Sequence, residues 1–409
     1  MVMVSSRPDA RFSSWSEFFQ YNILPLDKDK AKGLVSKLEY DRLVKRQFLQ
    51  KLEENLYEKH TSFASNPLLL TMMLLTYEQI AEIPNKIHLF YEQAFLTLFN
   101  KHDSLKSLYK RKSFSGLPLD EFKTVLSSFS ILSYSDRKYS FTQEEIDSYL
   151  EKSICISGIN ANTEHFLNDL LDSVCIMQRD GLGYTFTHRS FQEYFTALYL
   201  VGMVNENKYE IFDKIAFVND RDDVIPMIYD INSDLLEQEW IIPRLESLVS
   251  DFSTVPSTEE GKLITLSKLF KALVYKNKKE DGEAQSNTIA YRLYNQDNDH
   301  CHFLFLLQKI YSDDMIPFLK RSHTDLTDAQ QKVQSDLFRL DFPKKDRAII
   351  SIKDLSELKK STKDRIVKSG CCNLAVIRVD YAKYKLISLK TKHSEKQSDV
   401  AKLLLGAIS

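Results

Sequence analysis

Glycine, proline and cysteine are all scarce in this chain. Its 409 residues include only 10 glycines and 10 prolines, and both counts lie below average usage. With so few helix breakers and with 43% hydrophobic residues, the composition favours a globular and predominantly helical protein. The length allows several domains with sizeable cores. We therefore expect a mainly α fold.

The cysteines exclude two classes of site. There are five of them, an odd number without any paired CxxC spacing, at Cys155, Cys175, Cys301, Cys371 and Cys372. Neither a disulfide framework nor a zinc site is indicated, and the adjacent pair at the end is typical of buried structure. We expect a reducing compartment and no metal ligands.

Long hydrophobic runs are also missing. A run such as Leu68–Leu75 is far too short to span a bilayer, and no signal-peptide pattern opens the chain. The sequence therefore predicts a soluble, cytoplasmic protein with no membrane partner.

The net charge of −2 names no partner, but the charge is spread unevenly. Residues 344–402 hold 16 Lys or Arg against 7 Asp or Glu, a net charge of +9. A basic surface of this size attracts acidic partners by long-range steering. We predict that this region binds an acidic ligand, either a nucleic acid or an acidic protein. The alternative is a solvated face that only maintains solubility, and replacing Lys383, Lys385, Lys390 and Lys392 by Glu would separate the two.

The first hundred residues predict a strand followed by helices. The apolar run Met1–Val4 is typical of the end of a buried strand, which would need neighbouring strands. Charged helices are expected from Leu26 to Leu38 and from Asp41 to Leu56. Asn66-Pro67 predicts a helix start, with Asn as the cap and Pro at the first helical position. The helix that follows is apolar nearly all round and must be buried.

A winged-helix domain is predicted next. Apolar positions recur with helical spacing from Leu119 to Leu132, and Thr142 with Glu145 forms a capping box at the start of a second helix. A third helix is expected at Thr163–Leu171. Two alternating segments, Val174–Gln178 and Tyr184–Thr187, flank a glycine-containing turn and predict a β-hairpin.

His188 lies where the last strand of this hairpin runs into a further helix. Ser190 and Glu193 have capping-box spacing, which predicts that Ser190 caps this helix. A strand-to-helix junction presents backbone amides and the positive end of the helix dipole, so His188 and the backbone could together hold an anion such as phosphate. The alternative is a histidine whose ring is satisfied inside the core.

The remaining sequence predicts a helical region up to residue 340 and a small α+β module after it. The expected elements are helices at Leu235–Leu248, Leu263–Tyr275 and His302–Ile310, a polar loop at Lys276–Asn287, a strand at Ala348–Ile352, a helix near Leu355–Val367, a hairpin formed by Leu374–Val379 and Lys385–Leu389, and a final helix at Ser398–Leu405.

Three stretches, taken in order, resemble the latter half of a NACHT NTPase. They are Ser5-Ser6-Arg7-Pro8 with Pro25-Leu26 behind it, Asn66-Pro67-Leu68-Leu69-Leu70, and Phe-Thr-His-Arg-Ser-Phe-Gln-Glu-Tyr-Phe from Phe186 to Phe195. This family belongs to the STAND class, which includes the NOD-like receptors. The resemblance covers about residues 1–200.

The resemblance implies a nucleotide site shared between domains. Arg7 would match the sensor arginine that faces the γ-phosphate, and Pro67 the proline that packs against adenine. His188 would match the histidine that contacts the β-phosphate of ADP and locks the resting state. The implied domains are the end of the NTPase core (1–25), a NACHT-associated helical domain (26–117) and the winged-helix domain (118–203). The sequence pattern adds a helical domain (204–340) and a small basic module (341–409).

The chain departs from the family at its catalytic parts. No G-x-x-x-x-G-K-[ST] is present, because Gly261-Lys262 is followed by Leu263 and Pro256 stands where the first glycine belongs. The acidic strand that would hold Mg²⁺ is absent as well. We therefore expect ATP or ADP with Mg²⁺ in an intact parent protein, and neither bound nucleotide nor enzymatic activity in this chain alone.

The resemblance thus implies part of a bacterial nucleotide-dependent switch in signalling or antiphage defence. Its partners would be a missing N-terminal NTPase and effector part, or further copies of itself on activation. Two alternatives stay open, a winged-helix DNA-binding regulator and an inert helical scaffold. Against DNA binding, the segment Thr163–Asp172 carries Glu164, Asp169 and Asp172 and no Lys or Arg, so it would repel phosphates. A nuclease site at Asp380 is disfavoured because Ser388 replaces the second acid.

Overall fold

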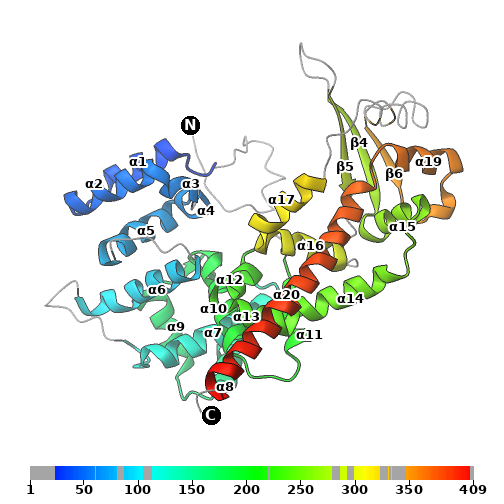
Figure 1. Ribbon diagram of the computed structural model, residues 1–409. Helices are drawn as coiled ribbons and strands as arrows, with labels where there is room; N and C mark the ends of the chain where they lie inside the picture. Colours follow the sequence, from blue (N-terminus) through cyan, green and yellow to red (C-terminus); the bar gives the residue numbers. More distant parts are fainter. Residues whose placement is uncertain are drawn as a thin grey trace. The chain divides into compact units, whose positions relative to one another are not determined.

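The computed structural model describes residues 24–59, 61–80, 87–104, 113–219, 222–278, 286–292, 299–322, 330, 333 and 347–405. These residues are mainly helical, which confirms the predicted fold class (Figure 1). The chain divides into two compact units, Met1–Lys101 and His102–Ser409, and each is described by itself. The predicted strand Met1–Val4 and the predicted site residue Arg7 lie outside the described residues.

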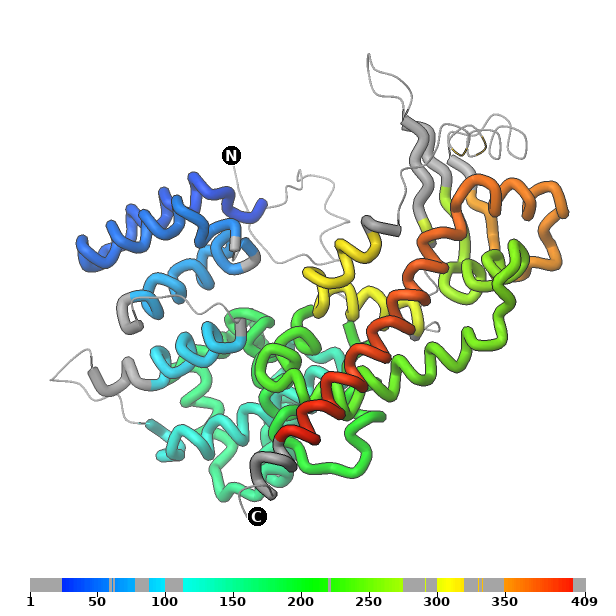
Figure 2. Tube along the Cα trace, in the orientation of Figure 1, coloured from blue at the N-terminus to red at the C-terminus, as the bar shows by residue number. Residues whose placement is uncertain are grey.

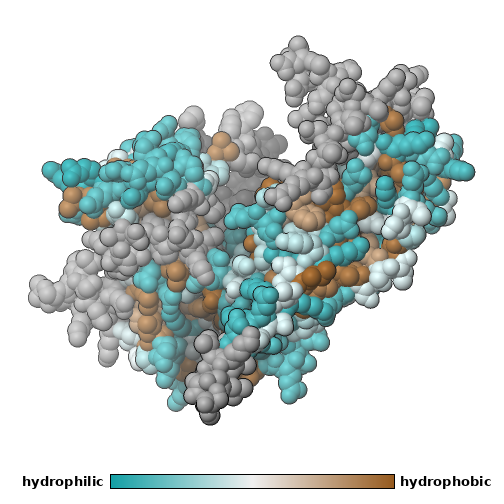
Figure 3. All heavy atoms as spheres, in the orientation of Figure 1, coloured by the Kyte–Doolittle hydropathy of each residue, from teal (hydrophilic) through white to brown (hydrophobic). Residues whose placement is uncertain are grey.

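The first unit is a set of helices, and both of the charged helices predicted for it are present. Asp27 caps α1 by accepting a hydrogen bond from the amide of Lys30, and Ala31 and Val35 form its buried side. The helices of this unit are α1 (Lys28–Lys37), α2 (Arg42–Lys51) with a π-helical continuation at Leu52–Leu56, α3 (Tyr57–Lys59), α4 (Thr61–Ala64), α5 (Pro67–Ile80) and α6 (Ile87–Ser104). Figure 3 shows hydrophilic side chains over most of α1 and α2, as their charged sequences require.

The start of α5 confirms the predicted cap. The side-chain oxygen of Asn66 accepts hydrogen bonds from the amides of Leu68 at 3.0 Å and Leu69 at 3.2 Å. Pro67 is the first helical residue, where its missing donor costs nothing. Leu69 and Leu70 behind it are buried, so the cap fixes where a core helix begins.

The predicted three helices and hairpin are present in the second unit. They run as α7 (Leu119–Ser135), β1 (Ser140–Phe141), α8 (Gln143–Ser157), α9 (Thr163–Asn168) with a π-helical turn at Asp169–Ser173, β2 (Met177–Asp180), β3 (Gly183–Phe186) and α10 (Arg189–Gly202). The sheet order is β1-β3-β2, with both pairs antiparallel. This is the order of elements in a winged-helix domain.

Local sequence signals account for these elements. The capping box of Thr142 and Glu145 is formed at the start of α8, as predicted. Gly181 turns the hairpin with a φ of +62°, and a Cβ on Gly183 would come within 2.6 Å of the carbonyl oxygen of Phe141. Glycine is therefore required at residue 183, where β1 lies against β3.

Where the structure describes it, the rest of the second unit is helical, with one further sheet. Its helices are α11 (Lys208–Ala216), α12 (Val224–Ile231), α13 (Ser233–Leu236) with a π-helical segment at Glu237–Ile241, α14 (Ile242–Ser253), α15 (Glu259–Leu269), α16 (Asp299–Ile310) and α17 (Ser312–Ser322). The predicted helix Leu263–Tyr275 is wrong at its end. The helix stops at Leu269, and a strand begins at Ala272.

The second sheet joins segments that lie far apart in the sequence. Strand β4 (Ala272–Lys278) is central, with β5 (Ser286–Arg292) on one side and β6 (Arg347–Ser351) on the other, both antiparallel to it. The strand predicted at Ala348–Ile352 is confirmed. The predicted loop Lys276–Asn287 is wrong at both ends, which are strand. A small α+β part is thus present, and its sheet draws on residues before and after position 340.

The hairpin predicted at Leu374–Leu389 is wrong. These residues belong to α20 (Asn373–Leu405), a single helix of 33 residues that also includes the predicted final helix. It follows a 3-10 turn at Leu355–Glu357 and the short helix α19 (Lys360–Lys368), and it runs alongside α14 (Figure 2). Packing against α14, α15 and α17 stabilises the helix over the β-branched residues that had favoured strands.

Candidate functional site

The two described site residues both stand at helix starts. Pro67 is the first residue of α5 in the first unit. His188 precedes α10 in the second unit. The structure therefore shows the local geometry of each residue separately.

His188 itself caps α10, which corrects the predicted capping box. Its Nδ1 accepts a hydrogen bond from the amide of Ser190 at 3.3 Å, and the Ser190 hydroxyl also contacts Nδ1. The helix therefore begins at Arg189 and not after Ser190. The His188 imidazole accepts the hydrogen bond of the Ser190 amide, so this amide belongs to the first turn of the helix. The predicted capping box of Ser190 and Glu193 is therefore not formed.

The proton of the His188 ring is assigned by this contact. A nitrogen that accepts a backbone N–H carries no proton, so the neutral ring is protonated on Nε2. The half-buried environment lowers the pKa of His188 by desolvation, which favours the neutral form. His188 can thus act as a hydrogen-bond donor through Nε2 but contributes no full positive charge.

Behind His188 lies a buried acidic pair that the sequence did not predict. Glu193 and Asp222 are 7% and 8% exposed. Arg189 lies between them, with Nε at 3.3 Å from Glu193 Oε1 and Nη2 at 3.9 Å from Asp222 Oδ2. The guanidinium also lies over the ring of Tyr139 at 4.0 Å. The only sequence signal for this cluster was the i,i+4 spacing of Arg189 and Glu193.

The positive charge of Arg189 does not fully offset the burial of the Glu193 and Asp222 carboxyl groups, and both pKa values are raised. Burial, with repulsion from Asp222, raises the pKa of Glu193 to about 7. Burial likewise raises the pKa of Asp222, whose Oδ2 accepts a hydrogen bond from the Tyr134 hydroxyl. Lys309 on α16 donates to the backbone oxygen of Asp222 at 2.5 Å and pairs with Asp223 at 2.8 Å. This cluster therefore connects the start of α10 to α16.

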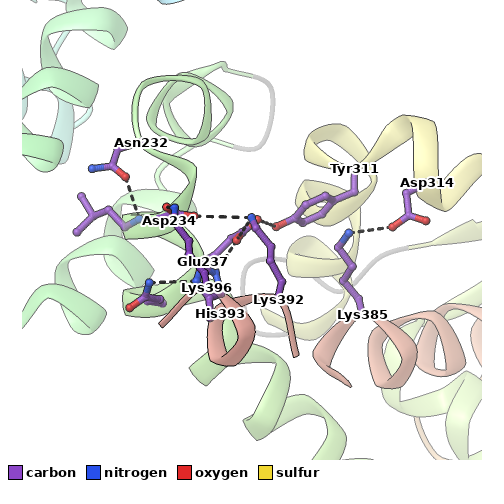
Figure 4. Close-up of polar contacts among 11 residues, drawn as sticks. Asn232, Asp234, Glu237, Tyr311, Asp314, Lys385, Lys392, His393 and Lys396 are labelled. Atoms are coloured by element: carbon purple, nitrogen blue, oxygen red, sulfur yellow. Dashed lines mark hydrogen bonds and ion pairs between the residues drawn. The ribbon is translucent and has the colours of Figure 1, made fainter. Parts of the chain in front are cut away.

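A second buried cluster centres on Glu237, which is 1% exposed (Figure 4). Its Oε1 accepts a hydrogen bond from Tyr311 at 3.0 Å, and its Oε2 lies 2.7 Å from both Lys392 Nζ and His393 Nε2. The Gln238 amide lies 3.1 Å from Nδ1 of His393, so His393 donates through Nε2. These contacts attach α20 to the segment after α13.

The same cluster contains a possible set of metal ligands. The ligand atoms of Asp234, Glu237 and His393 lie within 4.8 Å of one another. Lys392 pairs with Glu237, however, and Lys396 with Asp234. Two ammonium groups thus supply the positive charge that a metal ion would bring, so the arrangement is that of an ion-pair network.

The lysines of the predicted acidic-ligand surface each have an acidic neighbour within the chain. Lys383 lies 3.4 Å from Asp380, Lys385 lies 2.8 Å from Asp314, Lys390 lies 2.5 Å from Glu246 and Lys392 lies 2.7 Å from Glu237. An acidic ligand would compete with these carboxylates, and its binding stays a prediction.

A groove of about 810 Å³ lies between α7, the end of α10 and α11. Its size is that of a small-molecule site. Apolar residues such as Ile131 and Ile211 line it, while Lys123, Glu210 and Lys214 provide both signs of charge. The mixture specifies no ligand charge.

None of the helices in the described ranges combines the length and apolar character needed to cross a bilayer.

Three polar features of the described chain bear on its function. They are the Nε2–H donor at the start of α10, the acidic pair near it and the ion-pair network on α20. In comparisons with known proteins, the chain matches no protein-family model, and no curated protein matches it.

Proposed function

We propose that this chain is the ADP-sensing helical and winged-helix part of a nucleotide-dependent molecular switch. The observation that carries the proposal is the position of His188. It lies two residues after the end of β3, caps α10 and carries its ring proton on Nε2. A phosphate oxygen could accept a hydrogen bond from Nε2–H at the positive end of the α10 dipole.

The residues at this junction fit a phosphate in one respect and oppose it in another. The neutral imidazole and the helix dipole favour an anion. The nearby carboxyl groups of Glu193 and Asp222 repel one, but Arg189 lies between them and offsets part of their charge. Pro67 would contact adenine by resemblance, and a P-loop part outside this chain would hold the phosphates and Mg²⁺.

The resemblance supplies the biological setting of the proposal. The switch would act in signalling or antiphage defence, with an N-terminal NTPase and effector part, or further copies on activation, as partners. An acidic ligand at the C-terminal region would be its trigger. A DNA-binding function has less support, because the segment Thr163–Asp172 has no Lys or Arg to contact DNA phosphates. Its Asp169 carboxylate has a role inside the fold, where it accepts hydrogen bonds from the backbone amides of Phe114 and Ser115.

The deciding experiment starts from the DNA upstream of Met1. An in-frame P-loop there would allow the longer product to be purified and titrated with ADP. The 409-residue chain alone is expected to show no micromolar affinity for ADP or ATP by calorimetry and no turnover, because it lacks the phosphate cradle. Micromolar binding by the chain alone, or no ADP binding by the longer product, would contradict the proposal.

His188→Asn is the sharpest substitution at the proposed lock. Asparagine is a good helix cap and keeps α10 intact, but it removes the Nε2–H donor. In the P-loop-containing protein we expect weaker ADP binding by about 1.5–3 kcal/mol, the value of a hydrogen bond to a charged group, and higher basal activity. Calorimetric titration with ADP measures the change.

His188→Ala is the matched comparison. It removes the cap as well as the donor, so stability should fall by a further ~1 kcal/mol. If His188→Asn binds ADP like the natural protein and only His188→Ala is impaired, then His188 serves as a helix cap and the proposed lock is wrong.

A further inference from the structure

Arg378 is a buried cation, and none of the described side chains gives it an anionic partner. Its side chain belongs to α20, and the residue is 4% exposed. Nη2 donates to Oε1 of Gln308 at 2.8 Å, whereas Nε and Nη1 have no hydrogen-bond partner. Among the side chains that the structure describes, no carboxylate forms an ion pair with it. A guanidinium stays protonated in proteins, so the described side chains leave this buried charge uncompensated.

Other cations on the packed face of α20 show what is missing. Lys385 is buried like Arg378, with 7% of its surface exposed, but it lies 2.8 Å from the carboxylate of Asp314. His393 is 7% exposed and contacts Glu237 at 2.7 Å. Buried charges are normally paired in this way. Among the described side chains, the hydrogen-bond partner of Arg378 is a neutral amide and not a carboxylate.

The surroundings of Arg378 come from one side of α16. Cys301, Phe305 and Gln308 recur with helical spacing, and the guanidinium lies 4.3 Å from the centre of the Phe305 ring. Cys301 is buried, and Phe305 is 40% exposed, so this ring is where the surroundings of Arg378 reach solvent. Burial lowers the pKa of Arg378 and raises the pKa of the Cys301 thiol to about 12. The thiol therefore stays neutral and cannot supply the missing negative charge.

We propose that Arg378 is the centre of a binding site for a small oxyanion such as phosphate, between α20 and α16. The two unpartnered N–H groups, Nε–H and Nη1–H, would donate to its oxygens, and the guanidinium charge would be compensated. The first turn of α16, which contains Cys301, adds the positive end of a helix dipole on the same side. This site does not depend on the nucleotide function proposed for His188.

The test compares thermal unfolding of the full chain in sodium phosphate and in sodium chloride at equal ionic strength. Phosphate should raise the melting temperature of the natural chain by about 3 °C more than that of Arg378→Met, once its concentration is well above Kd. Equilibrium dialysis with labelled phosphate should then find one ion per natural chain and none on Arg378→Met.

Three controls make the result decisive. Arg378→Lys keeps the charge but lacks Nε–H and Nη1–H, so it should lose most of the phosphate effect even if Arg378→Met folds poorly. Lys385→Met removes a paired cation and should keep the full phosphate effect. In chloride, Arg378→Met should be at least as stable as the natural chain, because it removes an unpaired charge. An equal phosphate effect in natural and Arg378→Lys chains, or no phosphate bound by the natural chain, would overturn the proposal.

Discussion

Glu193→Gln is expected to stabilise the protein at pH 8 and to change its stability by less than about 1 kcal/mol at pH 5. The pKa of Glu193 is raised from 4.5 to about 7 in the folded protein, first by burial and then by repulsion from Asp222. A glutamine of the same shape keeps the packing without the charge. The expected gain at pH 8 is about 3 kcal/mol, because each pKa unit corresponds to about 1.4 kcal/mol.

The sign follows from where each state binds its proton. Below pH 4.5 both folded and unfolded forms hold the proton on Glu193, and its contribution to stability is fully present. As the pH rises towards 7, the unfolded form releases the proton while the folded form still holds it. Stability therefore falls across this window and is lost above it. The raised pKa of Asp222 acts in the same direction.

Urea unfolding at several pH values between 5 and 8 measures this effect. Glu164→Gln, on the exposed surface of α9, is the matched control and should follow the natural protein. Parallel stability curves for Glu193→Gln and the natural protein would show that Glu193 carries no strained charge.

Glu237→Ala should be strongly destabilising. The carboxylate is 1% exposed and accepts hydrogen bonds from Tyr311, Lys392 and His393. Its removal leaves the buried donors of Tyr311 and His393 without this carboxylate, which costs about 3 kcal/mol or more. The measurement is the free energy of unfolding from urea titration.

Glu246→Ala is the control for this second prediction. Glu246 on α14 pairs at 2.5 Å with Lys390 on α20, but the two side chains are 49% and 53% exposed. An exposed pair of this kind contributes less than about 1 kcal/mol. A similar small effect for both substitutions would mean that the Glu237 network is not stabilising.

The first half of the described chain was largely predictable because its signals are local. Asn66 and Thr142 are side chains that cap the helix directly after them, and the glycines at 181 and 183 define the hairpin turn. Each signal acts over a few residues, so tertiary packing has little to override. The start of α10 is the exception, because a histidine is an uncommon cap and a serine with better spacing stood two residues later.

The C-terminal half was harder to predict for a different physical reason. Helix α20 buries Arg378, Lys385 and His393 on its packed face. These residues hide the apolar stripe by which a helix is normally recognised. Their partners come from α16, α17 and the segment after α13, and no local pattern encodes such contacts. The same holds for Asp222, which meets Glu193 only through the packing of α12 on α10.

The second sheet has a consequence for dissecting the protein. Strand β4 pairs with β6 through five residue pairs, from Ala272 with Ser351 to Lys276 with Arg347. A truncation at the predicted boundary after residue 340 would remove β6 and leave one side of β4 as an open edge with unsatisfied backbone donors and acceptors. Open edges of this kind promote aggregation through intermolecular strand pairing. The region 204–340 should therefore be handled together with the C-terminal residues through Ser351.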